Sequence, residues 1–337
     1  MKTSIITGVG HYVPENIVTN DDLAKVIDTN DEWIQERTGI KERRHLGKHS
    51  GTTTSDLGTK AAKIAIENAG LTPKDIDFIL FATLSPDYFF PGCGVILQKN
   101  LGCDTIGAMD IRNQCSGFVY ALATADAYIR SGMYKNILVV GAENHSFGLD
   151  MTTRGRGVSV IFGDGAGAVV VSASDEKERG IITTNVHSEG EYAEELAVLF
   201  PGTKYGWADE LLVENNELTA EQIYPHMNGN FVFKHAVTRF PESIKEVFEK
   251  AGEDISNLKL FIPHQANLRI SQFVQKQLGL RDDQVFNNIQ KYGNTTAASI
   301  PIALSEAYNE KRFQKGDLLC MTAFGSGFTW GSILMRW

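Results

Sequence analysis

The hydrophobic and polar positions of the chain form two recurring patterns, short apolar runs and longer helical repeats. Ile76–Thr83 (IDFILFAT) is mostly apolar, as in a strand covered on both faces. Ser55–Gly70 has a helical pattern, Ile106–Ile111 (IGAMDI) predicts a short buried strand, and the apolar run from Phe118 to Ala123 predicts a buried helix. Strands that alternate with helices in this way predict mainly parallel sheets covered by helices.

Four pairs of segments recur in the same order in the two parts of the chain. The pairs are GLTPKDIDFILFA from Gly70 with GEDISNLKLFIPH from Gly252, QKNLG ending at Gly102 with QKQLG ending at Gly279, KNILVVGAE ending at Glu143 with GDLLCMTAF ending at Phe324, and SIITGVGHYVP from Ser4 with GIITTNVHSEG from Gly180. A single short match would be noise, but four in order indicate an internal duplication. We therefore predict two β/α halves, residues 1–175 and 176–337.

One segment, residues 189–230, has no counterpart in the first half. It carries many acidic residues, and Pro201, Gly202 and Gly206 interrupt its periodicity. We expect an inserted excursion or lid, and a lid is where substrate specificity is often decided.

Cys115 lies in the segment Asp110–Ala123 (DIRNQCSGFVYALA), between a predicted strand and a predicted helix. A cysteine at such a turn faces the positive end of the helix dipole, which favours thiolate over thiol. This placement predicts a nucleophile. The segment alone leaves open the commoner role of a free cysteine, that of a small buried hydrophobic residue.

The duplication points to two partners for Cys115. In the second half, the strand LKLFI is followed by PHQAN, which places His264 at the carboxyl end of a strand, where ligands gather in α/β sheets. The helix equivalent to the one after Cys115 is expected to begin near Asn294. Two helix starts related by pseudo-symmetry would point at one centre, so we expect Cys115, His264 and Asn294 to meet there.

A cysteine with a histidine and an asparagine is suited to acyl transfer through a thioester. A papain-type hydrolase uses the same residue types, but its sequence signature around the cysteine is absent here. Phe324-Gly325-Ser326-Gly327 ends the last duplicated strand and offers backbone N–H groups. One of these, together with the amide of Cys115, would form an oxyanion hole.

Composition narrows the class of protein. The chain has 337 residues and a net charge of −9, which argues against nucleic acid as a partner and means that an acidic protein partner would need a local basic patch. No run approaches the roughly 18 apolar residues of a membrane span, and the amino terminus lacks the apolar stretch of a signal peptide. Four cysteines in a chain of this length suggest neither a disulfide framework nor a metal site, so the expected location is the cytoplasm.

Trp33 and Arg37 stand four residues apart on a helix predicted within Asp28–Arg44, so they share one face. A flat aromatic ring beside a guanidinium group suits a nucleotide base and its phosphate. A packed tryptophan beside a solvated arginine is the alternative that these residues alone leave open.

Six motifs together resemble the β-ketoacyl-acyl-carrier-protein synthase III family of the thiolase superfamily. They are DTNDEWIQERTGIKERR, DIRNQCSGFVYAL, RGVSVIFGDGAGAVVV, PHQANLRI, GNTTAASIP and AFGSGFTWG, and they span nearly the whole chain in family order. The resemblance implies the duplicated α/β thiolase fold, with layers α/β/α/β/α, usually as a homodimer.

The resemblance also implies a ping-pong condensation without a cofactor. Cys115 would take an acyl group from acyl-coenzyme A, and malonyl-acyl carrier protein would then enter and lose carbon dioxide. His264 and Asn294 would donate hydrogen bonds to the thioester oxygen as the enolate forms. The oxyanion hole would use the amides of Cys115 and Ser326, where the family commonly has glycine in place of Ser326.

Further positions match those that bind substrates in the family. For coenzyme A they are Thr29, Trp33, Arg37, Arg156, Gly229, Phe233 and Asn267, with Trp33 and Arg156 on either side of the adenine and Arg37 at a phosphate. The acyl pocket would use Phe324 and Phe90, the latter reaching into the partner subunit. Lys234, Arg269 and Lys276 match basic positions that dock the acidic carrier protein, although a solvated surface charge is the simpler explanation for each.

The implied function is the initiation of fatty acid synthesis. LSPDYFFP and the insertion keep open a related enzyme of secondary metabolism that makes a quinolone or polyketide-type product. A cysteine thioesterase is a further alternative, which the pairing of His264 with Asn294 disfavours. A non-enzymatic binding protein fits least, because all three catalytic residue types are present.

Overall fold

The computed structural model describes residues 2–47, 50–204 and 220–337, which form two large sheets, the two-stranded sheets β2-β3 and β9-β10, and helices around them. The first sheet has the strand order β1-β7-β6-β4-β5 and the second β11-β12-β13-β8. In the first, the strands are β1 (Thr3–Tyr12), β7 (Gly165–Ser174), β6 (Asn136–Glu143), β4 (Phe78–Ala82) and β5 (Gly107–Ile111). In the second, they are β11 (Leu258–Pro263), β12 (Leu318–Gly325), β13 (Thr329–Arg336) and β8 (Gly180–Ser188).

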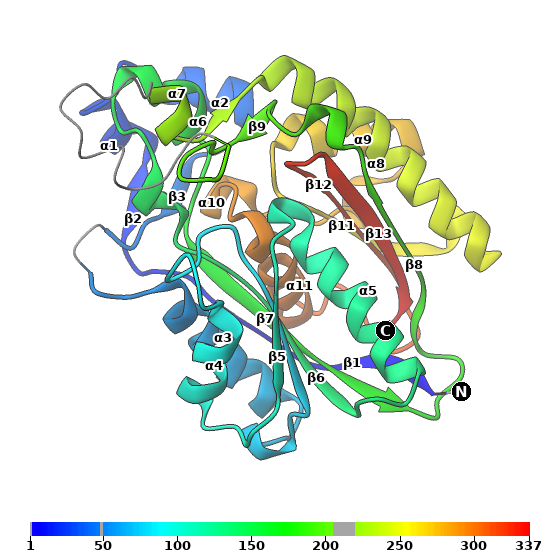
Figure 1. The fold of residues 1–337 in the computed structure, drawn as a ribbon. Coiled ribbons are helices and arrows are strands. Elements are labelled where there is room, and N and C mark those ends of the chain that lie inside the picture. Colours follow the sequence, from blue (N-terminus) through cyan, green and yellow to red (C-terminus); the bar gives the residue numbers. More distant parts are fainter. Residues whose placement is uncertain (1, 48–49, 205–219) are drawn as a thin grey trace.

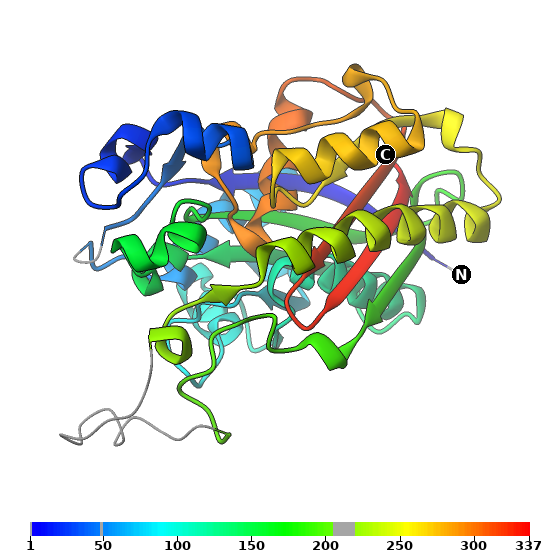
Figure 2. The ribbon, with the colours of Figure 1, turned by 90° about the horizontal axis from the view of Figure 1, so that it is seen from above.

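Helices form three layers around these sheets (Figures 1 and 2). α3 (Thr54–Asn68) and α4 (Cys93–Leu101) cover the outer face of the first sheet, and α8 (Gly229–Ala251) and α9 (Leu268–Leu278) cover the second. α5 (Gly117–Arg130) and α11 (Ser299–Asn309) lie between the sheets. The order α/β/α/β/α and the pseudo-equivalence of the two sheets confirm the predicted duplicated thiolase fold.

Shorter elements complete the described chain. They are β2 (Ile17–Thr19), α1 (Asn20–Ala24), α2 (Asp31–Thr38), β3 (Glu42–Arg44), α6 (Arg156–Ser159), β9 (Leu196–Ala197), α7 (Ala220–Ile223), β10 (His226–Met227) and α10 (Ile289–Tyr292). The segment expected as an insertion, 189–230, contains β9, α7 and β10, and its part 205–219 lies outside the described residues. The predicted division at 175/176 falls in the turn between β7 and β8, which belong to different sheets.

The prediction of mainly parallel sheets is wrong. β4 pairs in parallel with β5 and β6, and β11 with β12, but β1, β7, β8 and β13 form antiparallel pairs. For one of these pairs the reason lies in the connection, since a parallel pair needs a crossover of a dozen residues or more. β12 and β13 are joined by residues 326–328 alone, which permits only a hairpin.

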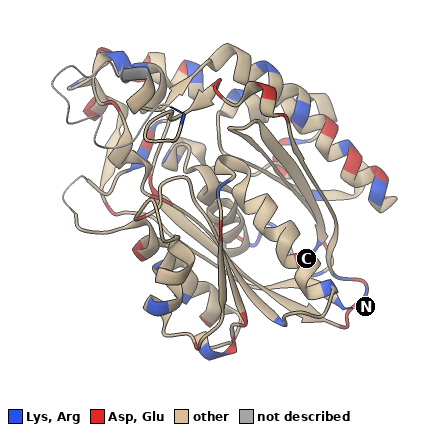
Figure 3. Cartoon of the chain, in the orientation of Figure 1, with Lys and Arg blue, Asp and Glu red and all other residues tan. Residues whose placement is uncertain are grey.

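The central helices meet the sheets through apolar side chains. Phe118, Val119 and Leu122 of α5 are fully buried, and so are Ala303 and Leu304 of α11, all in one core cluster with strands of both sheets. The Lys, Arg, Asp and Glu residues occur mainly on the outer helices and in loops (Figure 3). The first residues of both helices, 117–119 and 299–302, are all buried, so the amino-terminal ends of α5 and α11 lie deep inside the molecule.

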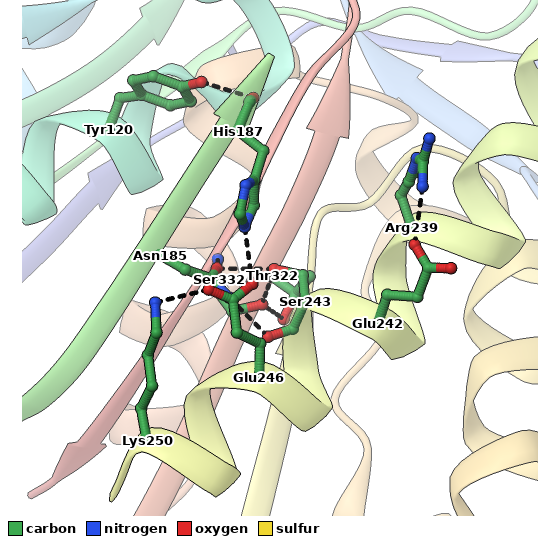
Figure 4. A network of polar contacts seen from close by, with 10 residues as sticks. All are labelled: Tyr120, Asn185, His187, Arg239, Glu242, Ser243, Glu246, Lys250, Thr322 and Ser332. Atoms are coloured by element: carbon green, nitrogen blue, oxygen red, sulfur yellow. Dashed lines mark hydrogen bonds and ion pairs between the residues drawn. The ribbon is translucent and has the colours of Figure 1, made fainter. Parts of the chain in front are cut away.

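A buried polar network ties α8 to the second sheet (Figure 4). The hydroxyl of Ser243 in α8 donates to the side-chain oxygen of Asn185 in β8 over 2.7 Å and lies 2.8 Å from the hydroxyl of Ser332 in β13. At the surface, His187 and Glu246 approach to 2.7 Å between the same two elements. These hydrogen bonds fix the position of α8 on the sheet, and with it the position of the amino-terminal turn of α8.

In the described part of the chain, no helix has the length and apolar character needed to cross a membrane. The same residues contain no group of three or more histidine, cysteine, aspartate or glutamate side chains placed to hold a metal ion.

Candidate active site

Cys115 lies where the sequence predicts it, at the start of α5. A short 3-10 turn (Gln114–Ser116) follows β5 and leads into the helix, and the thiol is 7% exposed. Gln114 has φ 45°, a left-handed conformation that few residues other than glycine adopt. The turn therefore places Cys115 at the helix amino terminus, between the two sheets.

His264 is the first residue after β11, as predicted. Its backbone N–H donates to the carbonyl of Thr322 over 2.8 Å, and its side chain is buried. Nδ1 lies 2.6 Å from the hydroxyl of Ser299, the first residue of α11. Nε2 is buried and has no hydrogen-bond partner within the described residues. Ser299 also accepts the N–H of Gln265 over 3.4 Å, so its own hydrogen can go to Nδ1, which leaves the proton of His264 on Nε2.

Asn294 lies in the loop between α10 and α11. Its backbone N–H donates to Ile161 and its carbonyl accepts from Gly163, over 2.9 and 3.0 Å. The side-chain oxygen accepts the N–H of Thr296 over 2.8 Å, which leaves the amide hydrogens free to face Cys115. The expectation that a helix begins near Asn294 is wrong, because the helix begins at Ser299 after a 3-10 turn (Thr296–Ala298).

One cavity of about 90 Å³ brings the three residues together. Cys115, His264 and Asn294 line it, with Phe324 and Gly325 from the end of β12. A Cβ added to Gly325 would stand 2.7 Å from the Cβ of Cys115, so only glycine fits there. The next residue, Ser326, donates its hydroxyl hydrogen to the carbonyl of Leu196, so its side chain points towards β9.

Burial dominates the electrostatics of the site. It raises the pKa of Cys115 to about 12, with the charge of the nearby Glu143 acting in the same direction and a hydrogen bond from Asn294 opposing it. Burial likewise lowers the pKa of His264 to about 3, so the imidazole is neutral. The thiolate expected from the helix dipole is therefore opposed by the larger effect of desolvation, and the resting side chain is a thiol.

Three of the residues predicted to contact coenzyme A line the same cavity, namely Gly229, Phe233 and Asn267. Asn267 caps α9 and donates from its side chain to the carbonyl of Arg37 over 2.9 Å, which joins the cavity to α2. Thr29, Trp33, Arg37 and Arg156 lie outside the cavity lining.

Trp33, in α2, packs against two guanidinium groups. The guanidinium carbon of Arg37 is 4.4 Å from the centre of a Trp33 ring, and that of Arg156 is 5.0 Å from it. Arg156 is also bonded to the carbonyl of Asp28 over 2.8 Å. An adenine between Trp33 and Arg156 needs about 3.5 Å on each side, so this base could enter only after Arg156 moves outward.

The remaining predicted residues lie on the surface. Phe90 is 77% exposed and does not line the cavity of its own chain. Lys234 in α8 and Arg269 and Lys276 in α9 are exposed. The guanidinium carbon of Arg269 lies 5.8 Å from the ring centre of Phe233, which places this charge beside the cavity, while Lys276 lies at the far end of α9.

The roles of three residues at the site were missed from sequence, although Gly325 was named there as part of the stretch that offers backbone N–H groups. Ser299 orients the His264 ring by a hydrogen bond, and Gly325 leaves room for Cys115 because it has no side chain. Glu143 is a fully buried carboxyl beside the catalytic residues. The sequence comparison pairs Glu143 with Phe324, and this register is wrong by one residue. Because β6 ends at Glu143 and the equivalent β12 ends at Gly325, the two strands correspond at an offset of 182 residues, which pairs Glu143 with Gly325.

Comparison with known proteins matches two family models. Residues 109–190 match 3-oxoacyl-[acyl-carrier-protein] synthase III, and residues 248–337 match the C-terminal part of the same enzyme. A β-ketoacyl-[acyl-carrier-protein] synthase III from Sulfurovum sp. is 44% identical over 97% of this chain and 94% of that protein.

Two solved structures have the same fold over nearly the whole chain. The 3-oxoacyl-[acyl-carrier-protein] synthase III from Aquifex aeolicus VF5 matches with a TM-score of 0.88 at 44% identity, covering 99% of this chain and all of that one. A priming β-ketosynthase from the R1128 polyketide pathway matches with a TM-score of 0.88 at 31% identity, covering 99% and 96%.

The buried neutral His264 predicts a pH dependence of stability. An unfolded histidine binds a proton below about pH 6.5, whereas folded His264 does not until about pH 3, so its contribution to stability is lost as the pH falls through this window. Between pH 7 and pH 5 the wild type should lose about 2 kcal/mol through this group. Equilibrium urea unfolding should show this loss reduced by the same amount in His264→Gln. An equal loss in both proteins would contradict a neutral, buried His264.

Proposed function

The chain belongs to the 3-oxoacyl-[acyl-carrier-protein] synthase III family, and we propose that it condenses an acyl-coenzyme A starter with malonyl-acyl carrier protein to initiate fatty acid synthesis. The single observation that carries this proposal is the meeting of Cys115, His264 and Asn294 at one buried cavity. Gly229, Phe233 and Asn267 line the same cavity. Asn267 is hydrogen-bonded to Arg37, whose guanidinium lies over the Trp33 ring, so the path from the cavity suits a pantetheine arm that ends in a nucleotide.

The first half-reaction transfers the acyl group to Cys115. The sulfur attacks the thioester carbonyl, the acyl–sulfur bond of coenzyme A breaks, and the thiol proton leaves with the departing thiolate as free coenzyme A. Burial keeps Cys115 protonated at rest, so proton loss and attack are coupled. The amides of Cys115 and Ser326, near the amino terminus of α5, would stabilise the oxyanion.

The second half-reaction uses the two neutral hydrogen-bond donors. Malonyl-acyl carrier protein loses carbon dioxide, and the electron pair of the broken bond forms an enolate whose oxygen accepts from His264 Nε2 and Asn294 Nδ2. Because His264 is neutral, it donates a hydrogen bond without transferring its proton. The enolate carbon attacks the acyl group on Cys115, and the cysteine leaves as thiolate and takes up a proton.

A second candidate is the priming of a specialised pathway with another starter. The structural likeness to a priming β-ketosynthase of a polyketide pathway favours it. Both candidates share the chemistry above and differ in the acyl group. We infer a cytoplasmic reaction, because all four cysteines are free thiols.

We further propose that the enzyme acts as a homodimer. β5 is the last strand of its sheet and is partly exposed, and an open edge of this kind pairs readily with a second copy. Tyr88, Phe89 and Phe90 are each more than half exposed, an apolar patch that a second subunit would cover.

Substitutions of the catalytic residues should separate the two half-reactions. Cys115→Ser should abolish condensation. His264→Ala should leave acyl transfer to Cys115 within about threefold while decarboxylation falls by at least about a hundredfold, since the lost donor acts on the enolate. Mass spectrometry of the acyl-enzyme and release of labelled carbon dioxide measure the two steps. Full condensation activity in either variant would refute the assignment.

Charge reversal at the cavity mouth should affect the carrier protein selectively. Arg269→Glu should raise KM for malonyl-acyl carrier protein by roughly tenfold, because a rim cation that attracts an acidic partner becomes repulsive, and should change KM for acyl-coenzyme A much less. Arg281→Glu makes the same charge change on an exposed arginine beyond the far end of α9 and serves as the control. Equal losses with both substrates would remove the docking proposal.

The dimer proposal predicts a shared acyl pocket. Sedimentation equilibrium at micromolar concentration should give about twice the chain mass of 37.1 kDa. Phe90→Ala should keep this mass and shift the preferred starter towards longer acyl groups, because it removes a side chain from the pocket wall, whereas Tyr88→Ala should not. A monomeric wild type, or an unchanged starter preference in Phe90→Ala, would contradict the proposal.

A further inference from the structure

Glu143, the last residue of β6, is a fully buried carboxyl. It accepts hydrogen bonds from the backbone N–H groups of Leu84 and Ser85, each over 3.2 Å, and from the hydroxyls of Thr83 and Ser85, over 3.1 and 2.6 Å. A further N–H, that of Ala297, lies 3.4 Å from Oε1, the oxygen that also accepts from Leu84. None of these donors is charged, so the site accommodates a carboxyl through hydrogen bonds alone.

The internal duplication relates Glu143 to the catalytic centre. An offset of 182 residues superimposes β6 on β12 and the 3-10 turn at Gln114 on that at Thr296, so Glu143 corresponds to Gly325 and Cys115 to Ala297. Both pairs are in contact, since Gly325 packs against Cys115 and Glu143 accepts from Ala297. In one half the strand end is a glycine that makes room for the thiol, and in the other a carboxylate fills the equivalent space.

Glu143 is linked to Cys115 through the loop that carries Asn294. Its carboxyl accepts a hydrogen bond from the N–H of Ala297. The side-chain oxygen of Asn294 accepts one from the N–H of the preceding residue, Thr296. Thr296 has φ 47°, a left-handed conformation that is costly for a β-branched residue and persists only when its surroundings enforce it. The hydrogen bonds to Asn294 and Glu143, on either side of the Thr296 Cα, hold Thr296 in this conformation.

We propose that Glu143 is a positioning residue for the condensation, whose carboxyl fixes the Thr296–Ala297 peptide and thereby the Asn294 amide that faces Cys115. This inference rests on the proposed function. The carboxyl acts on the reaction only through Asn294 and does not touch the substrate. It therefore bears on decarboxylation, which depends on Asn294, more than on acyl transfer to Cys115.

The electrostatics agree with this arrangement. Burial raises the pKa of Glu143 to about 7, and the carboxylate form is favoured by the donors from Ser85, Leu84 and Thr83. Its charge is in turn one reason why the pKa of Cys115 is high. The carboxyl therefore does not activate Cys115, and its contribution to the reaction is the loop that it holds in place.

The test compares the two half-reactions in Glu143→Gln, Glu143→Asp and the wild type. An amide keeps one acceptor oxygen and turns an NH₂ group towards the remaining donors, so either Ala297 or the Thr83–Ser85 loop loses its bond. In Glu143→Gln the ratio of malonyl decarboxylation to acyl transfer should fall about tenfold, the loss equivalent to one hydrogen bond. Glu143→Asp keeps both oxygens and should recover the ratio to within about threefold of the wild type.

Asp126→Asn is the matched control. Asp126 is a buried carboxylate on α5 that pairs with Arg130, away from the cavity, and its substitution should leave the ratio unchanged. If Glu143→Gln does not fold, as judged by circular dichroism, Ser85→Ala removes the shortest bond to the carboxyl and should lower the ratio about threefold.

An unchanged ratio in the folded Glu143→Gln or in Ser85→Ala would overturn the inference, and so would an aspartate variant no better than the glutamine variant. These outcomes are distinct from failure of the proposed function, in which the wild type itself would take up no acyl group on Cys115 or release no carbon dioxide.

Discussion

The close approach of Cys115 to Gly325 is the constraint on which the rest of the site depends. The two residues come from different halves, and no side chain larger than a hydrogen fits between them. Their contact fixes the amino terminus of α5 against the end of β12. His264 and Asn294, at the ends of neighbouring elements of the second half, then line the same cavity of about 90 Å³.

Burial determines which charge states the catalytic residues have at rest. Desolvation disfavours both the Cys115 thiolate and a charged His264, so the site at rest contains a thiol, a neutral imidazole and an amide. Such a set is suited to stabilising a charge that forms on the substrate, because hydrogen-bond donors that are already held in place in a buried cavity need little reorganisation as the charge develops. Ser299 and Glu143 hold these donors in place by hydrogen bonds to His264 and to the loop of Asn294.

Much of this could be predicted from sequence, and the exceptions have physical reasons. The apolar run of β4, the helix after Cys115 and the duplication were readable because burial imposes a pattern on neighbouring residues. The antiparallel pairs were missed because the apolar pattern of a buried strand is the same in either direction, and only the pair β12·β13 has a connection, 326–328, short enough to reveal its direction. Glu143 and Ser299 were missed because their partners lie 154 and 35 residues away in the chain, and no local pattern records such contacts.

The central claim is that Cys115 carries the acyl group between the two substrates. The most direct measurement is the intact mass of the protein after incubation with a panel of acyl-coenzyme A esters, with Cys115→Ser as control. The account predicts the gain of one acyl group in the wild type and none in the variant, and the ester that reacts fastest identifies the starter. No adduct with any ester, or an adduct that persists in Cys115→Ser, would contradict it.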